Sequence, residues 1–133
     1  MSIEIYIQGF SDGEPSGIPE AQVLDSFSIS EGPDEDGLYA LDFGPGMDCH
    51  LSMTLEDGAA VAVTILRPVT ADQLWVAVFD LLTKANYIAY ASEPRAVVAS
   101  AAVLEELPPD MFESFEDIAV VASAAELVKA LFD

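Results

Sequence analysis

Basic residues are scarce in this chain. Its 133 residues include 24 acidic residues and only four basic ones, Arg67, Lys84, Arg95 and Lys129, which gives a formal net charge of −20. Direct binding to nucleic-acid phosphates needs clustered Lys and Arg, so the composition argues against it. An anionic membrane surface is disfavoured for the same reason. The charge therefore predicts a partner that is neither nucleic acid nor membrane.

Cysteine and long apolar runs are scarce as well. Cys49 is the single cysteine, which excludes an internal disulfide and fits a reducing cytoplasm. No apolar run reaches the roughly 20 residues of a transmembrane helix. The start Met1–Ile5 has the pattern of a strand and no basic segment, so we expect no signal peptide and a cytoplasmic protein. The sequence leaves the oligomeric state open.

Apolar residues are abundant by contrast. They make up 52% of the chain, and the mean hydropathy is +0.36. An acidic disordered tail would be poor in such residues. The length suits one domain with a radius of gyration of about 14 Å, and no linker or internal repeat divides it. We therefore expect residues 1–133 to form a single globular domain.

Alternating apolar residues predict the strands. Ile3, Ile5 and Ile7 indicate a half-buried strand, and a three-stranded meander is expected at about 38–43, 49–55 and 59–66. We expect Phe43 to pair with Cys49 and Leu55 with Ala59. The second pair assumes a three-residue Glu56-Asp57-Gly58 loop. This register puts the large apolar side chains on one face: Tyr39, Leu41, Leu51, Met53, Val61, Val63 and Ile65.

The remaining segments predict helices, two short strands and two loops. Loops are expected at 9–17 and 28–37, and strands at 87–91 and 118–121. Helices are expected from Pro19, over 71–85 with a Thr70–Gln73 capping box, from Pro94, over 110–115, and after a second capping box of Ser123 and Glu126. Together they predict an α+β domain: a mixed, largely antiparallel sheet with helices mainly on one face.

No motif predicts a catalytic, cofactor or metal site. Cys49 and His50 are neighbours on a predicted strand, so they point to opposite faces and cannot form a nucleophile–base pair. Asp34-Glu35-Asp36-Gly37 resembles part of a calcium loop, but its glycine comes one position early, and we interpret it as a turn. Weak divalent-cation binding by clustered carboxylates stays open.

The distribution of acids is the unusual feature. Residues 1–66 contain 13 acidic residues and no base. Such clusters favour a negative patch for a basic protein, and exposed aromatics would serve as anchors. The candidates are the loop acids Asp12, Glu14, Asp34, Glu35 and Asp36, or Glu113, Glu116 and Asp117, with Phe112 or Trp75 as the anchor. A solvated charged surface and core packing of the aromatics are the alternatives.

The chain resembles small acidic proteins of bacteria. The segments Ile5-Tyr6-Ile7-Gln8-Gly9-Phe10, Asp12-Gly13-Glu14-Pro15 and Gly46-Met47-Asp48-Cys49 are similar to those of uncharacterised bacterial proteins of this size. In size, charge and α+β pattern it also resembles the immunity proteins that neutralise toxins. That resemblance implies a basic protein partner and transfers no functional residue.

Three function classes follow. The leading prediction is a non-enzymatic acidic binding protein for a basic protein, in the form of an immunity protein or of a DNA mimic. A domain adapted to high salt, without a charge-specific partner, is the first alternative. An enzyme that uses carboxylates with a divalent metal is the second, and the sequence offers it no paired base and nucleophile.

Overall fold

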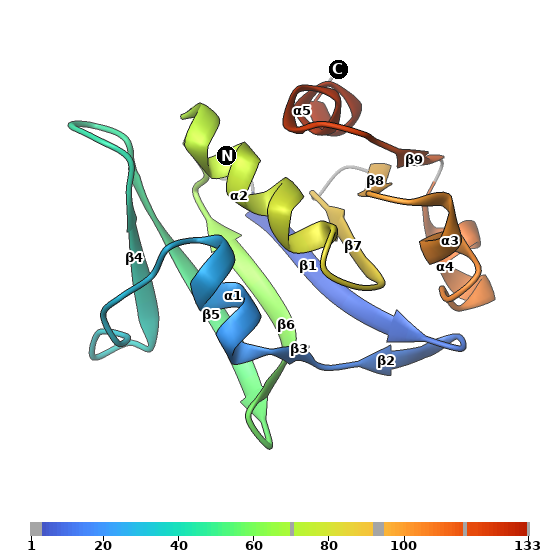
Figure 1. The fold of residues 1–133 in the computed structure, drawn as a ribbon, viewed down its shortest axis with the longest axis horizontal. Helices are drawn as coiled ribbons and strands as arrows, with labels where there is room; N and C mark the ends of the chain where they lie inside the picture. Colours follow the sequence, from blue (N-terminus) through green and yellow to red (C-terminus); the bar gives the residue numbers. More distant parts are fainter. Residues whose placement is uncertain (1–3, 70, 92–94, 116, 133) are drawn as a thin grey trace.

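One sheet runs through the molecule. The computed structural model describes residues 4–69, 71–91, 95–115 and 117–132. The main strand order is β4 (Leu38–Asp42), β5 (Asp48–Glu56), β6 (Ala59–Leu66), β1 (Glu4–Ser11), β7 (Tyr87–Tyr90), β8 (Arg95–Val98) and β9 (Asp117–Val120). Short strands β2 (Glu14–Ser16) and β3 (Ile18–Pro19) pair with β1 and β6. Only the β8–β9 pairing is parallel among these strands, which confirms the predicted α+β fold with its largely antiparallel sheet (Figure 1).

The helices cover the two faces of the sheet unequally. The main core lies under α1 (Glu20–Ser26), α2 (Asp72–Leu82) and α5 (Ala124–Phe132). The short helices α3 (Ala101–Leu104) and α4 (Pro109–Ser114) pack on a smaller second core on the other face. Figure 1 shows α3 and α4 at the β9 end of the sheet and β4 alone at the opposite end.

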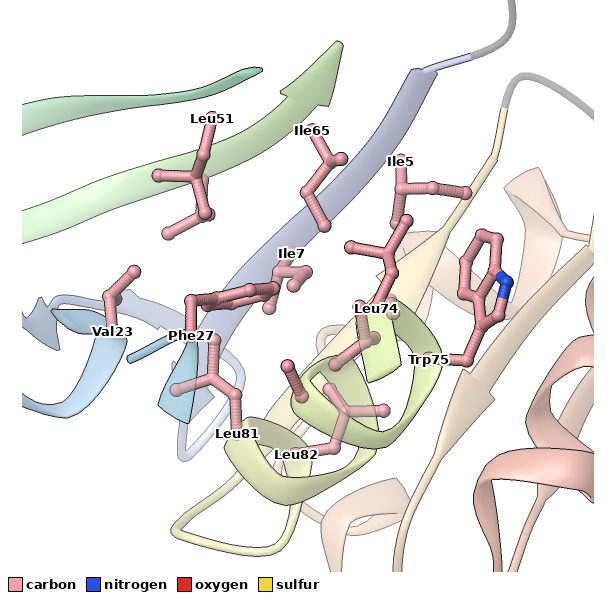
Figure 2. Close-up of a cluster of buried hydrophobic side chains, with 14 of the residues drawn as sticks. Ile5, Ile7, Val23, Phe27, Leu51, Ile65, Leu74, Trp75, Leu81 and Leu82 are labelled. Atoms are coloured by element: carbon pink, nitrogen blue, oxygen red, sulfur yellow. The ribbon is translucent and has the colours of Figure 1, made fainter. Parts of the chain in front are cut away.

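The main core joins α1 and α2 to the central strands. Its fully buried side chains include Ile5, Ile7, Leu51, Ile65, Leu74, Leu81 and Leu82 (Figure 2). Burying one such side chain contributes roughly 1.5–3 kcal/mol. The stripe predicted for the 71–85 helix is confirmed at Leu74, Val78, Leu81 and Leu82, whereas Ala85 follows the end of α2 and is exposed. No helix in the described part of the chain is long and apolar enough to cross a membrane.

The predicted meander forms, but its register differs. Leu41 pairs with Cys49, so the expected Phe43–Cys49 pair is wrong by two residues, and the same face stays inward. The β5–β6 loop is the two-residue turn Asp57-Gly58, with φ values of 54° and 82°. Positive φ at both positions is typical of the tight hairpin turn that Asp-Gly favours. The expected three-residue loop and the Leu55–Ala59 pair are therefore wrong.

A β-bulge restores the alternation of inward and outward side chains, which the two-residue turn alone would invert. The pairing shifts by one residue between Thr54 and Leu55, so that Met53 pairs with Val63. The shift turns Ala60 into the core, where it is fully buried. Val61 moves outward and is 40% exposed, so its predicted core position is wrong.

Two further expectations are corrected. The segment expected as a loop at 9–17 is a hairpin, because Ser11 pairs with Glu14 around an Asp12-Gly13 turn at φ 52° and 80°. The helix expected from Pro94 is replaced by β8 and the short α3. Val97 lies in the main core and Val98 in the second core, so this apolar run is a strand buried on both faces. Pro94 and Thr70 lie outside the described residues, and α2 begins after Ala71 as its N-cap.

The second capping box is confirmed in part. The backbone N–H of Glu126 donates to Ser123 Oγ over 3.2 Å, as a capping box requires. The Glu126 carboxylate accepts from the N–H of Ala122 over 3.1 Å, one residue before the expected donor. These bonds begin α5, whose Leu127 and Leu131 enter the main core.

Candidate functional site: an acidic cleft

A cleft of about 1110 Å³ opens between three parts of the chain. Its walls are the loop that follows α1, the edge strand β4 with Phe43, and the outer side of α2. Asp72, Val76 and Asp80 are four residues apart on α2, so they lie on one side of the helix and face the cleft together. The tertiary fold therefore assembles this site from two separate parts of the chain, residues 26–43 and residues 72–80.

The floor of the cleft is apolar. Phe27 and Leu41 line it and are 5% and 2% exposed, and Ile29 and Phe43 are partly buried beside them. Val76 is 57% exposed, which is unusual for a large apolar residue on a helix that otherwise buries such side chains. Val76, Ile29 and Phe43 thus offer apolar surface that a partner can cover.

The rim of the cleft is acidic. Its carboxylates are Glu31, Asp34, Asp42, Asp72 and Asp80, and none of the lining residues is Lys or Arg. The Asp34 carboxylate accepts backbone N–H bonds from Asp36 at 2.8 Å and Leu38 at 3.0 Å. The Leu38 bond is the main cause that lowers the pKa of Asp34 below its ordinary value. Asp34 therefore keeps its negative charge.

One lysine partly neutralises the α1 end of the rim. Lys84 Nζ lies 3.0 Å from Asp25 and 3.6 Å from Asp80, and Ser26 Oγ donates to Asp80 over 2.8 Å. The bond to Asp25 is the main cause that raises the pKa of Lys84, so the ammonium stays charged. Within the described residues, no basic side chain pairs with the other four rim carboxylates: Glu31, Asp34, Asp42 and Asp72.

The structure divides the loop acids that the sequence grouped. Asp34 lines the cleft, whereas Glu35 and Asp36 are exposed beyond it and are not lining residues. Asp12 and Glu14 lie at the β1–β2 hairpin instead. There the Asp12 N–H donates to Glu106 Oε2 over 3.0 Å, and the Gly13 N–H donates to the Glu106 carbonyl over 2.9 Å.

The second group of predicted residues lies at this other end. We call it the α4 end: the β1–β2 hairpin tip, Glu106, α4 and the start of β9. Phe112 is 49% exposed there, Glu113 and Asp117 are exposed, and Glu116 lies outside the described residues. Beneath it Tyr90 stacks on Tyr6 at 5.4 Å between ring centroids and meets Phe115 at 5.0 Å.

Trp75 is not a surface anchor. It is 7% exposed and belongs to the main core, on the far side of Leu74 from Phe27 (Figure 2). Trp75 is not among the residues that line the cleft. The prediction of Trp75 as an anchor is therefore wrong, and the alternative of core packing holds.

Sequence reasoning missed most of the cleft. Asp42, Asp72, Asp80 and Val76 were not among the candidates, although they line it. The available signal was the four-residue spacing of Asp72, Val76 and Asp80 on the side of α2 opposite its core stripe. Nothing local indicated that this side would face β4.

Groups for nucleophilic or metal chemistry do not converge. Cys49 is 4% exposed, and burial raises the pKa of its thiol. His50 is exposed on the other face of β5. Among the described residues, no three His, Cys, Asp or Glu side chains are placed to hold a metal ion. The metal-enzyme alternative gains no support from this geometry.

Comparison with known proteins adds no family to this description. No protein-family model matches the chain, and neither a curated protein nor a solved structure does. The geometry of the cleft is therefore the feature of this chain that points to a function.

Proposed function

We propose that this protein is a non-enzymatic acidic binding protein that recognises a basic protein partner through the cleft. One observation carries the proposal. The cleft combines an apolar floor with four rim carboxylates that no basic side chain pairs with in the described part of the chain. A merely solvated charged surface needs no concave apolar floor.

Lys and Arg side chains of a partner suit both features. Their aliphatic stems can cover apolar surface such as Val76 and Phe43, while their charged heads reach the rim. The net charge of −20 speeds association with a positive surface and orients it. Burial of Val76, which is 57% exposed in the free protein, and of the partly buried Phe43 then slows dissociation, since well-packed apolar contacts at an interface centre carry most of its binding energy.

The specific form we propose is an immunity-type neutraliser of a basic toxin, acting in the cytoplasm. Covering a basic surface would stop such a toxin from reaching an anionic substrate. A DNA mimic, which occupies a nucleic-acid-binding protein, is the related form. The identity of the captured partner separates the two.

A tagged pull-down from the native cell tests the proposal. The wild-type protein is compared with a cleft variant, Glu31→Gln/Asp42→Asn/Asp72→Asn. The matched control is Glu14→Gln/Glu113→Gln/Asp117→Asn, which removes the same three charges at the α4 end. We expect a basic protein that high salt releases, that the control variant retains and that the cleft variant loses at least about tenfold.

Each result decides between the hypotheses. Loss of the partner from the control variant but not from the cleft variant would move the site to the α4 end. If the wild type, the cleft variant and the control variant capture the partner equally well, the cleft does not bind it. If low salt yields no partner at all, the salt-adapted domain becomes the better interpretation.

A further inference from the structure

The outer side of β4 is open along part of its length. β4 is the last strand at its end of the sheet (Figure 1). Its residues also form one wall of the cleft. The hydrogen bonds at Leu38 show which way the backbone N–H and C=O groups of β4 point. The Leu38 N–H donates to Asp34 Oδ1 over 3.0 Å, and the Leu38 carbonyl accepts from the Asp34 N–H over 2.9 Å. Both backbone groups of Leu38 thus point away from β5.

The alternation of an antiparallel pair extends this to the rest of the strand. Residues that exchange bonds with the neighbour alternate with residues whose N–H and C=O point outward. Tyr39 and Leu41 therefore bond to β5, and Ala40 and Asp42 point outward like Leu38. The Phe43 N–H donates to the Met47 carbonyl over 2.9 Å, which agrees with this alternation of bonded and outward-pointing residues. Within the described residues, the 34–38 loop covers the Leu38 end only.

We propose that an extended basic segment of the partner adds to β4 as a further strand, pairing with Ala40 and Asp42. This inference rests on the proposed function and specifies how the partner binds. Main-chain bonds to an open strand edge supply affinity, and alternate side chains supply specificity. The window is short, so the added strand needs only a few residues.

The surroundings of the edge define the chemistry of that segment. On the cleft side, the added side chains would meet Phe43 and Val76, with Asp72 at the rim. On the other side they would meet a shallow hollow that Asp42, Asp48 and His50 line. Carboxylates therefore flank the edge on both faces of the sheet, which favours a segment with Lys or Arg on both of its faces.

The same charges disfavour a second copy of this chain as the occupant. The β4 segment Leu38–Asp42 carries no base, and two copies would each bring a net charge of −20. Charged residues at a strand edge are a common protection against pairing between identical chains. The β4 edge therefore disfavours pairing with a second copy of this chain and favours pairing with a basic strand.

Amide exchange measured by NMR tests the strand addition directly. The probe is the end-blocked peptide Lys-Lys-Val-Val-Lys-Lys at saturation, which carries lysines on both faces when it is extended. We expect exchange at Ala40 and Asp42 to slow at least about tenfold, because their N–H groups gain acceptors. Tyr39 and Leu41, already bonded to β5, should change little. Val120, on the opposite edge strand, should not change.

Two substitutions at Ala40 extend the test. Ala40→Pro removes only an outward N–H, and an edge strand tolerates proline at such a position. We expect it to weaken peptide binding at least about tenfold, whereas Ala40→Ser should stay within about twofold. Retained slow exchange at Ile7 in the main core would show that the proline variant is folded. If the Ala40→Pro variant does not fold, the exchange rates of Ala40 and Asp42 in the wild-type protein decide whether the peptide adds to β4 as a strand.

The outcomes separate this inference from the proposed function. If the cleft variant weakens peptide binding but Ala40→Pro does not, and the two amides stay fast, the cleft binds basic chains and strand addition is wrong. A peptide that does not bind at all also overturns strand addition. The proposed function itself is tested by the pull-down and not by the peptide experiment.

Discussion

The two acidic regions of this molecule differ in shape far more than in charge. The cleft is concave, and its floor includes Phe27 and Leu41 beneath a rim of five carboxylates. At the α4 end the hairpin tip is held against Glu106, and Phe112 stands 49% exposed. A count of acids along the sequence treats these regions as equivalent. The fold shows that the cleft arranges carboxylates from distant segments around a concave apolar floor.

The difference shows what makes an acidic surface selective. A carboxylate on an open surface is screened within about 8 Å at physiological salt and contributes little by itself. Carboxylates around an apolar floor act on a partner that also excludes water, where charge interactions are stronger. Shape therefore decides which of the 24 acids in this chain are worth testing first.

The largest expected effect contrasts the two phenylalanines. Phe27 is 5% exposed and belongs to both the main core and the cleft floor, so Phe27→Ala should lower the free energy of unfolding by roughly 3–5 kcal/mol. Phe112→Ala should lower it by less than about 1 kcal/mol, because half of that side chain is already in water. Urea denaturation of both variants measures the difference. Similar losses would mean that Phe112 is as much a core residue as Phe27.

A smaller effect is expected at the hairpin tip. Glu106→Ala removes the acceptor of the Asp12 N–H and should lower the free energy of unfolding by about 0.5–1 kcal/mol. It should also speed amide exchange at Asp12. The neighbouring exposed Glu105→Ala serves as the control and should change neither quantity. If Asp12 exchanges equally fast in all three proteins, the tip is not anchored and the contrast with the cleft weakens.

The smallest effect concerns pH. The backbone bonds from Leu38 and Asp36 lower the pKa of Asp34, so its contribution to stability is present above the unfolded-state pKa. That contribution disappears as the pH falls through the lower, folded-state pKa. A carbon-13 NMR titration of the Asp34 carboxyl should give a midpoint below 3.8, the ordinary value, and a higher midpoint in urea. A folded-state midpoint at or above the urea value would contradict the turn geometry.

Local patterns predicted the strands well where one face is buried and the other is not. Alternation placed Leu51, Val63 and Ile65 in the core, and the structure confirms this. It failed at Ala96–Val98, because a strand that is buried on both faces loses its alternation and reads like a buried helix. It also failed for residues 9–17, where Gly and Asp in a tight hairpin look the same as Gly and Asp in a loop.

The register of the meander shows a second kind of limit. A two-residue Asp57-Gly58 turn, taken alone, would put Val63 on the wrong face. The bulge at Thr54–Leu55 makes that turn compatible with the core. The turn residues and the apolar pattern are both local signals. The bulge that makes them compatible depends on how the whole hairpin packs.

The sequence by itself determined the charge, the α+β class and the inward faces of most strands and helices, because these depend on composition and on spacing between near neighbours. Only the tertiary structure decided that Trp75 is buried, that Asp12 meets Glu106, and that Asp72 faces β4 across an apolar floor. The physical reason is the range of the interactions. Periodicity acts over a few residues, whereas a cleft requires the packing of segments that the chain keeps far apart.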